Sequence, residues 1–285
     1  MSGSRRFSCT QCGACCNRSP EVELSEAAAL ADIFVFRLLF RLCSLPRFPE
    51  GGAAGGSELF YQKKRLLAAH AAAKFPRKVR RGGKVVETIQ YLMISALAVD
   101  TSPGACAALK AARCSIHEKR PYGCRTVPFH YSRPEGLALT DFDKFVATGG
   151  YRCDTSEGAA PFLEDGRIVD EDVRQARVSA LELAERDRVW KEAIVRQMRL
   201  RDAARELPTF AEMEENATFA AMTTSMRVGW QIAASSKLMT DEQKRGLVRL
   251  QLETIRRELA HFSGSASNAQ SLREMAVEYR KALQI

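Results

Sequence analysis

Four cysteines stand close together near the start of the chain, in the pattern Cys9-x-x-Cys12-x-x-Cys15-Cys16. A C-x-x-C turn brings two sulfur atoms to a separation that suits one metal, and a third cysteine at the same spacing can converge on that site. Apolar packing gives no reason for so many small thiols in one turn-rich segment, and Gly13 favours the tight backbone that the arrangement needs. The pattern therefore predicts that these side chains ligate metal.

A second group of cysteines is dispersed further along the chain: Cys106, Cys114, Cys124 and Cys153. The Arg120-Pro121 pair and Pro128 stiffen the loop around Cys124, so that a thiolate can be held in place there. Eight cysteines then form two groups of four, which fits either two mononuclear sites or one larger cluster. The ninth, Cys43, lies in an apolar run, and we interpret it as a small hydrophobic residue on a helix face.

The spacing leaves the identity of the metal open. Tetrathiolate sites generally favour Zn²⁺, but structural zinc sites usually use separated C-x-x-C pairs. Three cysteines at successive two-residue gaps instead resemble the bacterial ferredoxin loop, and the Cys15-Cys16 adjacency suits a polynuclear site. An iron–sulfur cluster and Zn²⁺ are thus both candidates, and a disulfide or redox role is a third. The metal could also be a purely structural clip that replaces a small hydrophobic core.

Two distant motifs in this order resemble the YkgJ-type cysteine-cluster family, whose CxxCxxCC domain is described as zinc- or iron-chelating. The first motif runs from Cys9 to Cys16, and the second runs from Cys106-x-x-Leu109 through Cys114-Ser-Ile-His117 to Phe129. The resemblance covers roughly residues 7 to 155 and implies metal ligation by the cysteines. Cys153 lies outside both tight motifs. His117 departs from the family pattern, which usually has Tyr there, so we do not expect it to be an obligatory ligand.

The cysteine-rich region is also similar to that of flagellin lysine methylases, which use S-adenosylmethionine as methyl donor. This resemblance implies an alternative function, that of a cluster-dependent protein lysine N-methyltransferase whose C-terminal half holds the acceptor chain. The sequence contains no donor-binding motif that we can identify, and neither a Walker-type phosphate loop nor a G-x-G-x-x-G after a strand is present.

Several charged residues near the motifs admit two interpretations each. Arg120 and Arg125 could bind an anionic cosubstrate, but compensation of the negative thiolate charge is the favoured role. His130 could ligate metal or relay a proton, although a structural role is favoured. The segment 74–84 contains six Lys or Arg residues and no acid. Its scarcity of aromatic residues favours a solvated hairpin face over nucleic-acid binding.

Composition places the chain among ordinary globular proteins, because 46% of its 285 residues are hydrophobic and 27% are charged. No apolar run approaches the ~20 residues of a membrane span. The basic N-terminus is not followed by an apolar stretch, so we expect no secretory signal. We therefore expect a cytoplasmic protein, in which nine cysteines favour metal binding or catalysis over a disulfide framework. A protein partner of the helical half is possible, and no membrane or nucleic-acid partner is expected.

The elements that would position the ligands are expected to be mainly helical. Apolar spacing predicts helices over about 25–43 and 58–74, and a long helix with Asp170 as its N-cap. The final helix is predicted to begin at Ser267 or Asn268. Two capping boxes are predicted further on, Thr209 with Glu212 and Thr240 with Gln243.

Only one β-hairpin is predicted, around Gly82-Gly83, because this pair separates two β-branched runs. The predicted fold is therefore mainly α. It consists of a cysteine-rich metal-binding domain over residues 1–157 with the small β-hairpin, and a helical bundle of three to five helices over residues 158–285.

Overall fold

The structure, a computed structural model, describes residues 4–45, 69–81, 83–101, 105–200, 206–215 and 221–284. The chain forms two compact units. Unit 1 contains Met1–Phe36, Leu97–Leu183 and Arg245–Ile285, and unit 2 contains Arg37–Ala96 and Ala184–Lys244. Each unit is thus assembled from segments that lie far apart in the sequence.

Unit 1 carries the cysteine motifs on short elements. A three-stranded antiparallel sheet has the order β1-β8-β9, and β6 pairs with β7 in a two-stranded sheet. The elements of this part are β1 (Arg5–Arg6), β2 (Glu21–Val22), α1 (Leu24–Ala29), β6 (Leu109–Lys110), β7 (Arg113–Cys114), α3 (Tyr122–Arg125), α4 (Ala138–Ala147), β8 (Pro161–Glu164) and β9 (Arg167–Ile168), with 3₁₀ turns η1 (His117–Lys119) and η2 (Glu135–Leu137).

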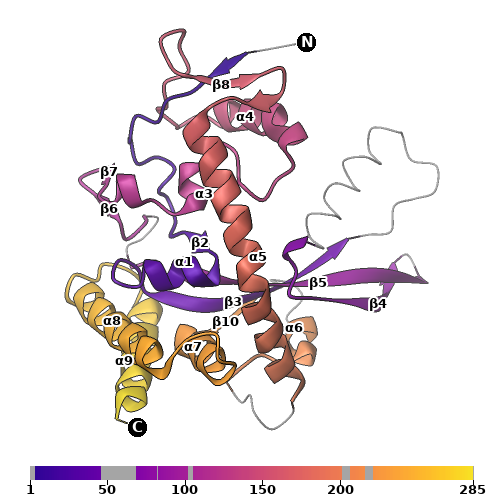
Figure 1. The fold of residues 1–285 in the computed structure, drawn as a ribbon, viewed down its shortest axis with the longest axis vertical. Coiled ribbons are helices and arrows are strands. Elements are labelled where there is room, and N and C mark those ends of the chain that lie inside the picture. The colour runs from indigo at the N-terminus through magenta and orange to yellow at the C-terminus, as the bar shows by residue number, and fades with distance from the viewer. Residues whose placement is uncertain are drawn as a thin grey trace. The chain divides into compact units, whose positions relative to one another are not determined.

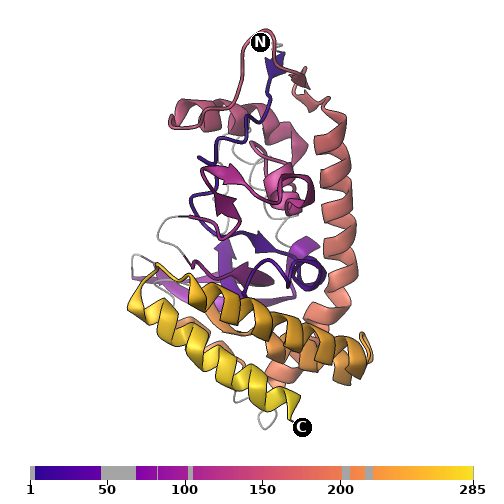
Figure 2. The same cartoon turned by 90° about the vertical axis from the view of Figure 1, so that its left-hand side faces the viewer.

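Two long helices complete unit 1 near its C-terminal end. These are α8 (Asp241–Ala260), of which all but the first four residues belong to this unit, and α9 (Ala266–Leu283). They lie side by side in both views (Figures 1 and 2). The Ser265 hydroxyl caps α9 by accepting a hydrogen bond from the Asn268 amide, so this helix begins slightly earlier than predicted.

An aromatic core holds together the part of unit 1 that carries the first and last cysteines. The ring of Phe7 meets those of Phe142 and Phe162 at centroid distances of 6.3 and 5.6 Å. Cys153 packs against this core, and Phe7 precedes Cys9 by two positions. The thiols at both ends of the motif region are therefore anchored to the same apolar cluster.

Unit 2 contains a long-stranded antiparallel sheet. Its strands include β3 (Phe36–Leu45), β4 (Ala73–Arg81), β5 (Lys84–Ala98) and β10 (Ala221–Ser225), with β3 between β10 and β5 and with β4 paired to β5. Arg81 pairs with Lys84, which confirms the predicted hairpin at this position (Figure 1). Two short helices, α6 (Phe210–Glu215) and α7 (Met226–Ser235), and the second part of the long helix α5 (Glu171–Arg199) also belong here.

The prediction of a mainly α fold is wrong, because the described residues form three antiparallel sheets as well as helices and the fold is mixed α/β. The largest error lies at β3, whose residues up to Cys43 were predicted to be helical. Phe36, Leu38 and Phe40 are all fully buried, and Leu39 between them is only 2% exposed. When a strand is buried on both faces, its sequence does not alternate between apolar and polar residues. The hydrophobic pattern therefore does not distinguish a central strand from a buried helix.

The predicted helix starts are confirmed where a local capping pattern marks them. The Asp170 carboxylate accepts a 2.9 Å hydrogen bond from the Val173 amide at the start of α5. Both capping boxes form reciprocal bonds of 2.7–3.1 Å between the residues predicted: Thr209 with Glu212, and Thr240 with Gln243. The predicted helix over 58–74 lies largely outside the described residues, and its end at Lys74 lies in β4.

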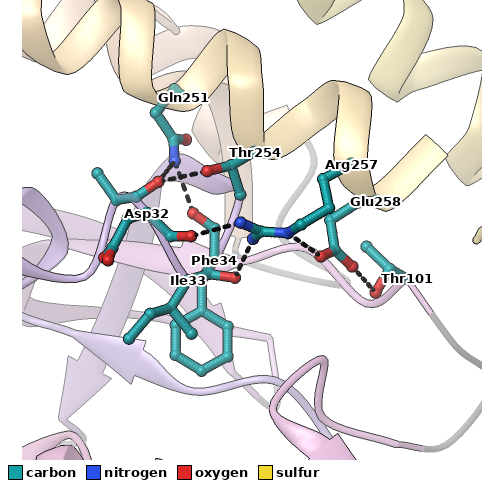
Figure 3. Close-up of polar contacts among 9 residues, drawn as sticks. Asp32, Ile33, Phe34, Thr101, Gln251, Thr254, Arg257 and Glu258 are labelled. Carbon is teal, nitrogen blue, oxygen red and sulfur yellow. Dashed lines mark hydrogen bonds and ion pairs between the residues drawn. The ribbon is translucent and has the colours of Figure 1, made fainter. Parts of the chain in front are cut away.

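Helix α8 fixes the segment that precedes β3. The Gln251 side chain is fully buried, and its amide nitrogen donates to the carbonyls of Ala31 and Phe34 at 2.7 and 2.6 Å (Figure 3). Its oxygen accepts a 2.9 Å bond from the Phe36 amide. Thr254 also donates to the Ala31 carbonyl, at 2.9 Å. One face of α8 thus supplies hydrogen-bond partners to several backbone groups that are not paired in a regular β-ladder.

The same helix also contacts Thr101. Glu258 accepts a 2.9 Å hydrogen bond from the Thr101 hydroxyl (Figure 3). The neighbouring Asp100 accepts a 2.8 Å bond from the Ser19 amide, just beyond the first motif. Asp100 and Thr101 are therefore tied to the end of the first motif and to α8. No helix in the described part of the chain combines the length and apolar character needed to cross a membrane.

Candidate metal centre

All eight predicted ligands line one cavity of about 320 Å³, which lies entirely within unit 1. Their segments are separated by as many as 144 positions, from Cys9 to Cys153. Cys43, predicted to be structural, is not among the lining residues and belongs to unit 2. The cysteines on the cavity are Cys9, Cys12, Cys15, Cys16, Cys106, Cys114, Cys124 and Cys153.

Cys9 and Cys153 are brought together by a β-bridge. Ser8 and Asp154 exchange two backbone hydrogen bonds of 2.8 and 3.0 Å in an antiparallel bridge. In antiparallel pairing the residue after one partner faces the residue before the other, so the bridge places Cys9 opposite Cys153. The sequence offers no local signal for this contact.

Cys12 belongs to the same side of the cavity. The hydroxyl of Thr10 donates a 2.8 Å hydrogen bond to the carbonyl of Arg152. Burial acts to raise the pKa of Cys12, but hydrogen bonds, chiefly from the Ala14 and Arg152 amides, outweigh it, so the pKa is lowered. Burial, followed by the charges of Cys9, Cys12 and Cys15 and a hydrogen bond with Cys12, raises the pKa of Cys153 to about 12.

Cys16 lies instead against the second motif. Its carbonyl accepts a 2.9 Å hydrogen bond from the Cys106 amide, and the Cys106 carbonyl accepts one of 2.9 Å from the Leu109 amide. Leu109 pairs with Cys114 in the β6-β7 ladder. Backbone contacts thus connect Cys16, Cys106 and Cys114 in one short path.

Gly13 allows the first motif to approach this ladder closely. Its φ is +73°, a conformation that L side chains rarely adopt. A Cβ atom at this position would lie 2.7 Å from a methyl carbon of Leu109 and 2.8 Å from the carbonyl oxygen of Ala112. The expected need for tight backbone at Gly13 therefore has a specific cause, which is the packing of one cysteine motif on the other.

Cys15 and Cys16 differ sharply in their proton affinity although they are adjacent. A hydrogen bond from the Cys16 thiol is the main cause that lowers the pKa of Cys15 to about 6; burial opposes it, and the Arg120 charge assists it. The same hydrogen bond raises the pKa of Cys16 well above its ordinary value, with burial and the nearby Cys106 and Cys114 adding to the effect. The Cys15 thiolate is therefore favoured over the Cys16 thiolate, and both residues line the cavity.

Cys124 is the most deeply placed of the second-motif thiols. It lies in α3, where its amide donates a 2.8 Å hydrogen bond to the Pro121 carbonyl. Burial raises its pKa to about 12, and the charges of Cys106, Cys15 and Cys114 add to the effect. Burial also raises the pKa of Cys106. These thiols lie close enough to affect one another electrostatically.

The positively charged residues predicted near the ligands also line the cavity. The Arg120 Nη1 lies 3.8 Å from the Cys9 sulfur, and its Nε donates a 2.8 Å bond to the His117 carbonyl. The Arg125 guanidinium lies 5.8 Å from the centre of the Tyr122 ring. Arg120 is therefore placed to compensate thiolate charge directly, whereas Arg125 makes a cation–π contact in the same wall.

The two histidines weighed as ligands differ in position. His117 lines the cavity, and burial together with the Arg120 charge lowers its pKa. His130 is not among the lining residues. Its Nδ1 lies 2.8 Å from the Ser132 hydroxyl, and its ring stacks on Tyr131 at 4.5 Å. His130 therefore has structural contacts where it lies.

Three charged residues of the cavity wall were not predicted as site residues. Arg18, Asp170 and Asp172 all line it. Asp170 was predicted only as the N-cap of α5, and no role was predicted for Arg18 or Asp172. A capping pattern carries no sequence signal for a second role, so this part of the wall follows from tertiary structure alone.

The donor set suits a soft or borderline metal, because eight thiols face one cavity and thiolates select zinc or iron–sulfur centres. Within the described residues, however, no group of three Cys, His, Asp or Glu side chains is arranged to hold a metal ion. A zinc–sulfur bond is roughly 2.3 Å long, so the thiols would have to move closer together to coordinate one ion. The cavity thus gathers the right donors without a preformed coordination geometry.

Comparison of the chain with protein-family models, with curated proteins and with solved structures finds no match. The resemblance to the YkgJ-type family therefore stays a prediction that rests on the two cysteine motifs.

Proposed function

We propose that this chain is a metal-binding protein that holds Zn²⁺ or an iron–sulfur cluster through the cysteines of unit 1. A single observation carries the proposal: eight of nine cysteines, from segments far apart in the sequence, line one cavity, and the ninth does not. Thiols buried only for packing would be distributed among the cores of both units. Convergence on one cavity is instead what metal ligation requires.

The surroundings of Cys15 favour the deprotonated form that metal ligation needs. Ligands must be deprotonated to bind, and Cys15 has a pKa of about 6 beside the Arg120 charge. A metal held there would supply either cross-linking of the short elements or one-electron redox chemistry. Strands β6 and β7 are two residues long each, and α3 is only four. A region built from such short elements gains most from cross-linking by metal.

The proposal is tested by metal and acid-labile sulfide analysis of protein purified without oxygen, together with its absorption spectrum. Iron with stoichiometric sulfide and a broad visible band would identify a cluster, and zinc without visible absorption would identify a mononuclear site. Cys114→Ser should bind less metal than the wild type, whereas Cys43→Ser, matched in chemistry but outside the cavity, should keep it. A protein that retains no metal, or whose metal content falls equally in both variants, would refute the proposal.

A further inference from the structure

The eight thiols form two spatial groups, and these groups do not follow the order of the cysteines in the sequence. The bridge between Ser8 and Asp154 places Cys9 opposite Cys153, and the Thr10 hydroxyl, two residues before Cys12, donates a 2.8 Å hydrogen bond to the Arg152 carbonyl. On the other side, the Cys106 amide donates to the Cys16 carbonyl. The backbone therefore pairs the last cysteine with the start of the first motif, and the end of the first motif with the second.

The two remaining thiols complete these groups. Cys15 follows Cys12 at the same spacing at which Cys12 follows Cys9. Cys124 belongs to the second motif, lies in α3 and lines the same cavity as Cys106 and Cys114.

From this geometry we propose that unit 1 contains two separate four-sulfur metal sites, linked through the adjacent residues Cys15 and Cys16. The inference rests on the proposed metal-binding function. The first set is Cys9, Cys12, Cys15 and Cys153. The second set is Cys16, Cys106, Cys114 and Cys124.

The adjacency of Cys15 and Cys16 explains why one motif serves both sets. Two neighbouring side chains can reach different metals, and in two-cluster ferredoxins the fourth cysteine of a similar run ligates the other cluster. Each set then combines ligands from a C-x-x-C turn with ligands that only the tertiary fold supplies.

A tryptic peptide makes this division measurable, because Arg6 and Arg18 enclose the first motif and no Lys or Arg lies between them. Reduced, metal-free protein is loaded with zinc to half saturation, and exposed thiols are alkylated. The protein is then unfolded with chelator, and the protected thiols are labelled with a second reagent. In half-loaded molecules, the proposal predicts that the peptide Phe7–Arg18 carries the first label on one or three of its cysteines.

If all eight thiols formed one cluster, or if the two sites followed the order of the sequence, the four cysteines of this peptide would be either all protected or all alkylated. That result would overturn the inference. Protein that binds no zinc gives four alkylated cysteines at every zinc concentration, and this outcome refutes the proposed function itself. The two failures are therefore distinguishable on the wild-type chain, without a substitution that could disturb folding.

Single substitutions provide a second readout. Cys153→Ser and Cys106→Ser are each expected to bind half of the wild-type zinc. In Cys153→Ser the remaining zinc should protect Cys16 from alkylation but not Cys9. In Cys106→Ser the remaining zinc should protect Cys9 but not Cys16. Complete loss of zinc in either variant, with Cys43→Ser unaffected and the circular dichroism spectrum unchanged, would contradict two separate sites.

Discussion

The amide of Cys106 donates a 2.9 Å hydrogen bond to the carbonyl of Cys16. These residues lie 90 positions apart, and this bond joins the end of the first cysteine motif to the start of the second. The packing of Gly13 against Leu109 reinforces this contact between the two motifs. The arrangement of the thiols therefore depends on a backbone contact between the two motifs, and weakening that contact should affect metal binding without removal of any ligand.

Gly13→Ala is expected to destabilise the protein and to weaken zinc binding. Left-handed φ costs an L residue about 1–2 kcal/mol. The new Cβ would also clash with Leu109 and with the Ala112 carbonyl oxygen, which adds about 1–3 kcal/mol. Gly149→Ala is the matched control, because Gly149 has φ +70° and no atom within 4 Å of its Cβ position. Urea unfolding of both variants measures the difference, and equal losses of stability would contradict the packing role of Gly13.

The types of the site residues could be predicted from sequence because ligand chemistry is local. Spacing in Cys9 to Cys16 identifies thiolate ligands, and a Gly-Gly pair marks the β4-β5 hairpin. Helix starts at Asp170 and Thr240 could be predicted because a cap bonds to an amide three residues away. All of these signals act over a few residues.

The grouping of the thiols could not be predicted, because it depends on non-local pairing. Sequence order groups Cys16 with Cys9 and leaves Cys153 outside both motifs, whereas the bridge at Ser8 and Asp154 places Cys153 beside Cys9. The error at β3 has the same origin. Its apolar run is a strand because β5 and β10 lie on either side of it, which no local pattern records.

Arg120→Gln is expected to weaken metal binding modestly. Its guanidinium lies 3.8 Å from the Cys9 sulfur, and its charge helps to lower the pKa of Cys15. Cys9 is exposed, so solvent screens the interaction, which is worth about 1 kcal/mol or less and changes affinity by up to roughly fivefold. Competition for zinc with a chelator at low and high salt measures the effect. Arg113→Gln, an exposed change in β7 away from the cavity lining, is the control. A wild-type affinity in Arg120→Gln at low salt would exclude this role.

In metal-free protein, Cys15 is expected to react with iodoacetamide at neutral pH. Its pKa of about 6 lies below the ordinary value, so the reactive thiolate is present above pH 6 and its alkylation slows as the pH falls through 6. Cys124, with a pKa of about 12, should react slowly at neutral pH. Alkylation rates for each cysteine, measured by mass spectrometry between pH 5 and 9 at constant salt, provide the profile.

The Cys16 thiol is the main cause of this shift, and two substitutions separate it from the other causes. Cys16→Ala removes the hydrogen-bond donor, so the reactivity profile of Cys15 should move to higher pH. Cys16→Ser keeps a hydroxyl donor in the same place and should retain most of the shift. Identical profiles in the two variants would show that Arg120 and the backbone, rather than residue 16, set the proton affinity of Cys15.

Gln251→Leu is expected to destabilise unit 1 by about 2–5 kcal/mol, because two buried backbone groups lose their hydrogen-bond partner. These are the Phe36 amide and the Phe34 carbonyl; the Ala31 carbonyl keeps its bond from Thr254. Leucine fills nearly the same volume, so the loss reports hydrogen bonding rather than a cavity. Chemical denaturation measures it.

The control for this substitution is Gln270→Leu in α9, at an exposed glutamine that bonds only to Glu274 among the contacts described for it. A change at that position should stay within about 0.5 kcal/mol. Because α8 also holds Thr101 through Glu258, loss of the Gln251 contacts should weaken the hold of α8 on Thr101, five positions before Cys106. Hydrogen exchange at the Cys106 amide should therefore accelerate in Gln251→Leu and not in Gln270→Leu. Equal exchange in both variants would show that α8 supports β3 without positioning the thiols.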